Sequence, residues 1–262
     1  MFIDAMGTRV HTVSFGAGER IVVGIAGSFG TWEMWQQPFE LLSGRYRVIA
    51  YDHLGAGLTD APDGLVSFES QVDCLFAVLD HYGVDRCVLA GDSNMVTVAI
   101  EAALREPDRF DGLALVAGGV VHEPDERVTA FVAGLRQDFD RTLDGFVAVC
   151  VPEPDAEHIR GWLQAIIRRT GAERAAKMVE SFYGVDLSSR LPELGVPTTV
   201  IQGDHDALPA SNAEAARRMA ETIPQCRFVL LEGAGHVPTL TRPVDVAREL
   251  ELLFERPSPR DS

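Results

Sequence analysis

The stretch that decides the fold reads Cys87-Val-Leu-Ala-Gly-Asp-Ser-Asn-Met-Val-Thr-Val-Ala-Ile100. Its residues up to Gly91 are typical of a buried strand, and a helix-compatible apolar run begins just after Ser93. A serine on such a sharp strand-to-helix turn holds its hydroxyl clear of the sheet. The next backbone N–H then lies at a helix N-terminus, where unpaired amides stabilise developing negative charge. The segment therefore makes Ser93 a candidate nucleophile.

The same segment allows two other interpretations. Met95 occupies the position of the second glycine in the G-x-S-x-G pattern, so Ser93 taken alone would also serve as a simple helix N-cap. In a register shifted by one residue, Asp92 becomes the nucleophile, as in carboxylate-dependent dehalogenases and epoxide hydrolases. That register places Ala90 and Asn94 at the two small positions of the motif.

Around this turn, short apolar runs alternate with longer amphipathic segments, a pattern that predicts a mostly parallel sheet with helices on both faces. The predicted strands are Ile21–Ala26, Arg47–Tyr51, Arg86–Ala90, Gly112–Val116, Thr198–Gln202 and Arg227–Leu231, preceded by a hairpin of Phe2–Ala5 and Val10–Phe15. The predicted helices are Trp32–Leu42, Phe68–His81, Val96–Arg105, Asn212–Thr222 and Val244–Phe254.

The alternation stops between about residues 121 and 187. We therefore expect residues 1–120 and 188–262 to form one α/β core, with residues 121–187 inserted as a helical cap. Separate helices at one end of the molecule are the alternative, and residues after Pro257 resemble a polar tail. The helical patterns within the insertion are Arg127–Phe139, Ala156–Arg169 and Ala172–Phe182.

Composition narrows the possible partners. The 262-residue chain is 46% hydrophobic and carries a net charge of −16, which disfavours nucleic acid and anionic membranes. The N-terminus lacks the basic and apolar regions of a secretory signal. We therefore expect a cytoplasmic protein with a small-molecule substrate, no cofactor and no metal, while the oligomeric state stays open. The cysteines, expected to be reduced, are Cys74, Cys87, Cys150 and Cys226.

Two loops near the C-terminus also follow predicted strands. Gly233 and Gly235 give the loop before His236 the freedom to turn back over the sheet. Histidine suits the role of general base because its ordinary pKa lies near neutrality. After the strand that begins at Thr198, Asp206 extends further into its loop than Asp204 does, and we prefer it as the acid. Asp204 is the alternative, although it would also suit a turn or a cap.

The three candidate residues occur in the chain order Ser93, Asp206, His236, each just beyond the carboxyl end of a predicted strand. Catalytic groups of open parallel sheets gather at that edge. Order and placement together therefore predict a catalytic triad more specifically than any one of the motifs does.

With these residues in place, the sequence resembles the α/β-hydrolase family over nearly its whole length. The stretch Ala26-Gly-Ser-Phe-Gly-Thr-Trp-Glu-Met-Trp35 resembles the family's His-Gly oxyanion loop, with Ala26 in place of histidine. The resemblance implies an oxyanion hole made by the backbone N–H groups of Ser28 and Asn94. The stretch Asp52-His-Leu-Gly-Ala-Gly-Leu-Thr-Asp60 resembles a turn that is structural in the family.

The nearest subgroup in these features is that of small hydrolases with a short helical cap, such as RsbQ-type stress regulators and plant strigolactone or karrikin receptors. The predicted triad and oxyanion loop favour hydrolysis of a carboxylic ester or lactone through an acyl-Ser93 intermediate. The aromatic and apolar residues near the predicted site suggest a small, mainly apolar substrate. A slow-turnover ligand sensor, a carbon–carbon hydrolase, a cofactor-independent oxygenase and an Asp92-based dehalogenase are the alternatives. The residues expected to shape the substrate pocket are Phe29, Trp32, Met95 and Trp162.

Overall fold

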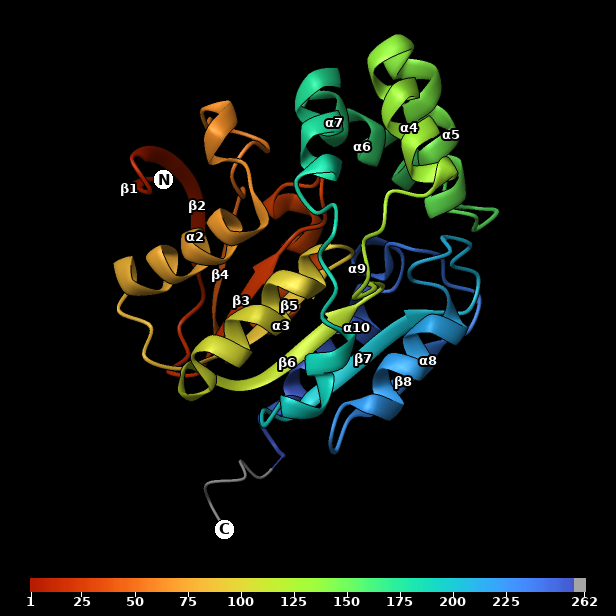
Figure 1. Cartoon of the computed structure of the whole chain (residues 1–262). Coiled ribbons are helices and arrows are strands. Elements are labelled where there is room, and N and C mark those ends of the chain that lie inside the picture. The colour runs from red at the N-terminus through yellow and green to blue at the C-terminus, as the bar shows by residue number, and fades with distance from the viewer. Residues whose placement is uncertain (257–262) are drawn as a thin grey trace.

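A twisted sheet forms the centre of the computed structural model, which describes residues 1–256 (Figure 1). The tail predicted after Pro257 lies outside the described residues. The strand order is β1-β2-β4-β3-β5-β6-β7-β8; β2 is antiparallel to β1 and β4, and the other pairs are parallel. The strands are β1 Phe2–Ala5, β2 Thr8–Phe15, β3 Ile21–Ile25, β4 Arg47–Tyr51, β5 Cys87–Asp92, β6 Phe110–Val116, β7 Thr198–Gly203 and β8 Arg227–Leu231.

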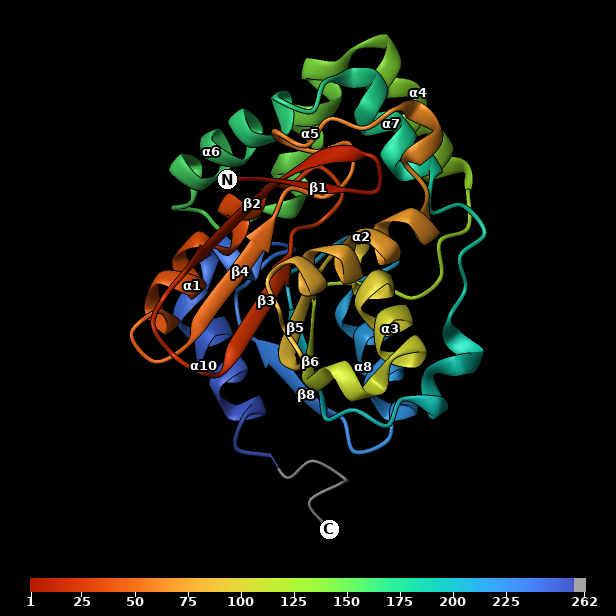
Figure 2. The same ribbon diagram turned by 90° about the vertical axis from the view of Figure 1, so that its left-hand side faces the viewer.

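Helices cover both faces of the sheet. Helices α1 and α10 pack together on one face, and α2, α3 and α8 lie on the other (Figure 2). The α-helices are α1 Gln36–Leu42, α2 Phe68–His81, α3 Met95–Arg105, α4 Glu126–Gln137, α5 Phe139–Cys150, α6 Glu157–Arg168, α7 Ala172–Glu180, α8 Ala213–Thr222, α9 Pro238–Thr241 and α10 Pro243–Leu253. The 3-10 helices are η1 Trp32–Trp35, η2 Asp63–Leu65, η3 Pro107–Arg109 and η4 Ser188–Glu193. Within residues 1–256, no helix is both long enough and apolar enough to cross a bilayer.

The predicted α/β architecture is confirmed, and most element boundaries differ from the prediction by only one or two residues. The strand at the candidate nucleophile is longer than predicted, because Gly91 pairs with Leu115 and Asp92 pairs with Val116 of β6. Strand β5 therefore continues to the residue immediately before Ser93.

The segment between β6 and β7 contains helices α4–α7, called here the inserted helices, which lie together at one end of the sheet (Figure 1). The helix predicted over Arg127–Phe139 ends at Gln137. Helix α5 was not among the predicted helices. The break falls at Asp138, which leaves the helical conformation and accepts a hydrogen bond from the backbone N–H of Arg141. An antiparallel bridge between Val121 and Asp186 closes the base of the insertion.

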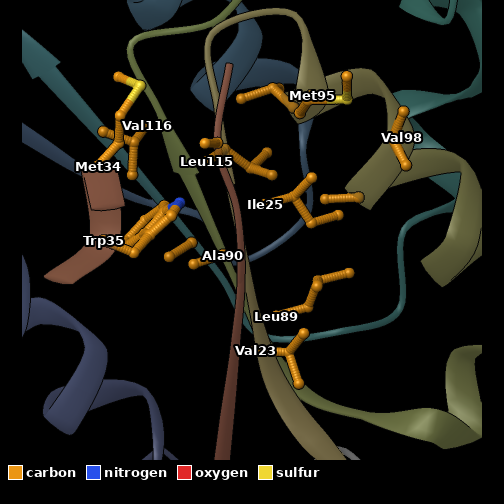
Figure 3. Packing of buried hydrophobic residues seen from close by; sticks show 14 of the residues in the cluster. Val23, Ile25, Met34, Trp35, Leu89, Ala90, Met95, Val98, Leu115 and Val116 are labelled. Carbon is orange, nitrogen blue, oxygen red and sulfur yellow. The ribbon is translucent and has the colours of Figure 1, made fainter. Parts of the chain in front are cut away.

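Met95 lies in the core below the turn at Ser93. Its side chain is fully buried and packs in the hydrophobic cluster that contains Ile25 and Leu115 (Figure 3). The close backbone approach at the turn is provided instead by Gly91, where an added Cβ would lie 2.6 Å from the Met95 carbonyl oxygen. Met95 thus packs in the core, and Gly91, two residues before Ser93, allows the close backbone approach at the turn.

Truncating Met95 should therefore destabilise the protein. We expect Met95→Ala to lower the free energy of unfolding by about 2–5 kcal/mol, because it removes a buried side chain and leaves a cavity. Urea denaturation followed by circular dichroism measures this loss. Leu41→Ala, at a side chain that is 56% exposed, is the control and should cost far less. Equal losses for both variants would contradict the packing role of Met95.

Candidate active site

Ser93 sits on a strained turn between β5 and α3. Its φ of 57° places it in the left-handed region, which costs a non-glycine residue roughly 1–2 kcal/mol. The turn is held by the Ser93 N–H, which donates to the Val116 carbonyl oxygen at 2.9 Å. Strain of this kind persists where the surroundings fix the backbone, and it is common at active sites. This conformation presents the Ser93 hydroxyl above the end of the sheet.

His236 connects Ser93 to Asp206. The His236 Nε2 atom lies 3.0 Å from Ser93 Oγ, and Nδ1 lies 2.8 Å from Asp206 Oδ2. Because an ionised carboxylate only accepts, Nδ1 carries the proton and Nε2 is free to accept one from the serine hydroxyl. The structure thus brings together the three residues predicted from the strand-end loops.

Asp206 is held in place by further donors. Gln202 Nε2 and Ser211 Oγ each donate to its Oδ2 at 2.9 Å, and the Leu208 N–H donates to its Oδ1 at 3.0 Å. Asp204 points elsewhere and accepts from the Gly233 N–H at 2.7 Å, so it shapes the histidine loop rather than orienting the imidazole. Gln202 and Ser211 could not be identified from the sequence, because nothing in the local pattern distinguishes them from other polar residues.

Burial and charge act in opposite directions on this pair. Burial lowers the pKa of His236, but the adjacent Asp206 carboxylate and its hydrogen bond outweigh this effect and raise the pKa above the ordinary value. Burial likewise raises the pKa of Asp206, and the charge and hydrogen bond of His236 bring it below the ordinary value. The interaction therefore favours an ionised Asp206 next to an imidazole of increased basicity.

The histidine loop is bonded to the last residue of α5 and to the chain segment that follows it. The His236 N–H donates to the Cys150 carbonyl oxygen at 2.8 Å, and the Gly235 N–H donates to Glu153 Oε1 at 2.8 Å. These contacts could not be predicted from the sequence, because no local pattern relates residues this far apart in the chain. They couple the position of the imidazole to the end of the inserted α5 helix.

The loop after β3 brings Ser28 close to Ser93. Among the described residues, the backbone N–H groups of Ser28 and Asn94 donate to no protein acceptor. The loop is supported by the buried His53, whose Nε2 donates to the Gly27 carbonyl oxygen at 3.2 Å. Burial lowers the pKa of His53, which keeps its imidazole neutral. The neighbouring Asp52 carboxylate has a structural role, since it accepts from the N–H groups at the start of η1 and in its own turn.

Two cavities meet at Ser93 and His236, with volumes of about 40 and 410 Å³. Of the predicted pocket residues, Phe29 lines both. Trp32, Met95 and Trp162 line neither of them. Met95 packs in the core, and Trp32 begins η1. On α6, the neighbouring Leu163 lines the smaller cavity; Trp162, one residue earlier, lies about 100° away around the helix. These three residues thus contribute to neither of the two cavities at Ser93.

Asp92 lies beside Ser93 in an unusual environment. It is fully buried, and neither of its carboxyl oxygens makes a hydrogen bond of ordinary geometry to the described residues. Burial raises the pKa of Asp92 to about 7, although His236 and the nearby backbone of Gly27 and Ser93 oppose the rise. The imidazole contacts Ser93, and not Asp92, through Nε2.

The raised pKa of Asp92 predicts a pH dependence of stability. A carboxyl group that binds its proton more tightly in the folded state stabilises the protein at low pH. This contribution is lost as pH rises from about 4 to about 7. Relative to Asp92→Asn, the wild type should lose at most about 1.4 kcal/mol per pH unit in this range. Denaturant unfolding between pH 4 and 8 measures it, with exposed Asp155→Asn as the control. Parallel curves for wild type and Asp92→Asn would contradict the prediction.

A serine, a histidine and an aspartate connected in this way on a strand-to-helix turn define the class of proteins that carry a Ser-His-Asp triad. Residues 22–249 match the alpha/beta hydrolase family, and the chain belongs to this family.

Several known proteins are similar to this chain over nearly its whole length. A pimeloyl-[acyl-carrier protein] methyl ester esterase of Nitrosomonas europaea is 28% identical, with 89% of this chain and 95% of that protein covered. A strigolactone esterase of Arabidopsis thaliana is 25% identical, with 97% and 98% covered. The crystal structure of an enol-lactonase from Burkholderia xenovorans superposes with a TM-score of 0.89 at 22% identity, covering 98% of this chain and all of that one, and so shares its fold.

Proposed function

We propose that this protein hydrolyses a carboxylic ester or lactone of a small, mainly apolar substrate through an acyl-Ser93 intermediate. The observation that carries the proposal is the hydrogen-bonded series from Ser93 Oγ through His236 to Asp206, located where two cavities meet. The similarity to the strigolactone esterase and to the pimeloyl methyl ester esterase supports ester bonds as the target.

In the first step, Ser93 Oγ attacks the substrate carbonyl carbon while His236 Nε2 takes the hydroxyl proton. Asp206 stabilises the imidazolium that forms, because its carboxylate already accepts the Nδ1–H hydrogen bond. When the tetrahedral intermediate collapses, the bond to the alkoxide breaks and His236 gives its proton to the leaving oxygen. The products of this step are an alcohol and an acylated Ser93.

The negative charge on the tetrahedral oxygen requires donors fixed in advance. The N–H groups of Ser28 and Asn94 suit this role, since both residues line the larger cavity beside Ser93 and neither amide is satisfied by a described residue. Asn94 also immediately precedes α3, where the helix dipole favours negative charge. Removing one such donor typically costs about 3 kcal/mol of transition-state stabilisation.

In the second step, water takes the place of the departed alcohol. His236 Nε2 accepts a proton from this water, whose oxygen attacks the acyl carbon, and the proton then returns to Ser93 Oγ as the ester bond breaks. The inserted helices act as a cap over this site. Phe131 of α4 and Phe146 of α5 line the larger cavity and give it an apolar wall.

Replacing the nucleophile tests the proposed function. Ser93→Ala should reduce kcat/KM for p-nitrophenyl acetate and butyrate at least about a thousandfold, because no acyl-enzyme forms. A fluorophosphonate probe should label wild-type Ser93, as detected by mass spectrometry, and should leave the variant unlabelled. Absence of Ser93-dependent turnover on short esters would overturn the esterase activity and favour a ligand sensor.

The raised pKa of His236 predicts an acid limit of activity. The imidazole must be neutral to accept the serine proton, so kcat/KM should fall as pH drops through a His236 pKa that lies above 6.5. Asp206→Asn removes the charge that raises this pKa, and the titration should then move to lower pH. The pH dependence of kcat/KM and NMR titration of the imidazole nitrogens measure the two effects. An unchanged midpoint in the variant would refute this coupling.

A further inference from the structure

The two cavities at Ser93 differ in the exposure of the residues that line them. The smaller one, of about 40 Å³, contains no exposed residue in its lining, which is drawn from the Gly27–Gly30 loop, η1, α5, α6 and the histidine loop. The larger one, of about 410 Å³, reaches the surface at the exposed residues Glu123, Asp125 and Arg127. We call the smaller cavity, whose lining has no exposed residue, the inner cavity, and the larger one, with exposed residues in its lining, the outer cavity.

An aromatic cluster stands at the boundary between them. The rings of Phe29, Phe131 and Phe146 lie 5.1–6.2 Å apart between centroids. Phe29 and Phe146 line both cavities, whereas Phe131 lines only the larger one. Ser93 and His236 also line both, so the two parts of a substrate attacked at Ser93 can extend in different directions.

We propose, on the basis of the proposed function, that the inner cavity holds the acyl group and the outer cavity holds the alcohol, so that the substrates are esters of a short, uncharged acyl group with a larger apolar alcohol. The order of bond breaking supports this orientation. The alcohol leaves first, while the acyl group stays on Ser93 until water attacks. A leaving group in the outer cavity can depart past the exposed rim and admit that water, whereas one in the inner cavity would be trapped behind the acyl group.

The size of the inner cavity limits the acyl chain. One water needs about 10–15 Å³ by this measure, so 40 Å³ accommodates roughly three or four non-hydrogen atoms. With the carbonyl oxygen assigned to the Ser28 and Asn94 amides, room for three or four carbon atoms allows acyl groups up to butyryl. The outer cavity lies within the range of about 300–1,000 Å³ that is usual for small-molecule sites.

The chemistry of the inner cavity favours an uncharged acyl group. Its lining includes the apolar side chains of Met34, Leu163, Ile167 and Val237. Asp92 and Cys150 also line it. Burial first, and then the charges of Asp206 and Asp92, raise the pKa of the Cys150 thiol well above its ordinary value. A carboxylate on the acyl chain would lose its hydration here and face a second acidic group, which is unfavourable.

Leu163 and Cys150 set the length limit. Leu163 is buried and lies one helical turn before Ile167 on α6, so both side chains face the cavity. Cys150, the last residue of α5, lines the same cavity from another side. Shortening Leu163 should enlarge the acyl site, and enlarging Cys150 should reduce it.

The test is an acyl-length series measured as kcat/KM on p-nitrophenyl acetate, butyrate, hexanoate and octanoate. In the wild type, we expect kcat/KM for the hexanoate and octanoate esters to be at least about tenfold lower than for the butyrate ester, because a longer chain must displace packed side chains. Leu163→Ala should move the preferred length to hexanoate, and Cys150→Leu should move it to acetate. These shifts are opposite, so general destabilisation of the fold cannot produce both.

Phe131→Ala is the matched control in the outer cavity. It should keep the acyl-length order and instead change the preference among ethyl, benzyl and 1-naphthylmethyl acetates. The orientation is overturned if Phe131→Ala shifts the acyl length while Leu163→Ala and Cys150→Leu do not, or if the wild type prefers octanoate. Loss of all Ser93-dependent turnover would overturn the proposed function itself and this inference with it, a result distinct from turnover with a different length profile.

Discussion

The left-handed backbone of Ser93 is the constraint on which the rest of the site depends. A serine in this conformation requires the strand before it to be fixed and the helix after it to start at once. Pairing of β5 with β6 up to Asp92 meets the first requirement, and Gly91 meets the second by letting the first turn of α3 approach closely. Core packing of Met95 then anchors α3 from below. The position of the hydroxyl is thus set by the sheet, so that loops need to supply only the base and the acid.

The two buried carboxylates near His236, those of Asp206 and Asp92, differ in their hydrogen bonding. Asp206 receives hydrogen bonds from Gln202, Ser211 and the Leu208 amide as well as from the imidazole, so both of its carboxylate oxygens have donors. Asp92 receives none of ordinary geometry, and its charged form is disfavoured near neutral pH. A buried polar group without a partner costs stability, so Asp92 is a local cost of the site whereas the satisfied Asp206 is part of its support.

The sequence was sufficient for the fold class and for the three residues that the structure connects by hydrogen bonds. Parallel strands end at one edge, so Ser93, Asp206 and His236 could be placed together from strand-end positions alone. The interior of the inserted helices could not be placed in this way. To distinguish Leu163 from Trp162, one must know which face of α6 turns inward. The break between α4 and α5 at Asp138 was also hidden, because the amphipathic pattern continues across it. Long-range contacts such as Glu153 to Gly235 leave no local signal at all.

The hydrogen bonds from the histidine loop to Cys150 and Glu153 connect the inserted helices to the α/β sheet region that carries the site. Cys150 provides its carbonyl oxygen to the His236 N–H and lines the inner cavity with its side chain. The same residue therefore contacts both the base and the space that we assign to the acyl group. Because protein interiors are close-packed, a chain too long for that space would press on Cys150 and, through it, on the histidine loop. Selection by length would then act on the rate of the chemical step as well as on binding, since the imidazole must stay within hydrogen-bond reach of Ser93 Oγ.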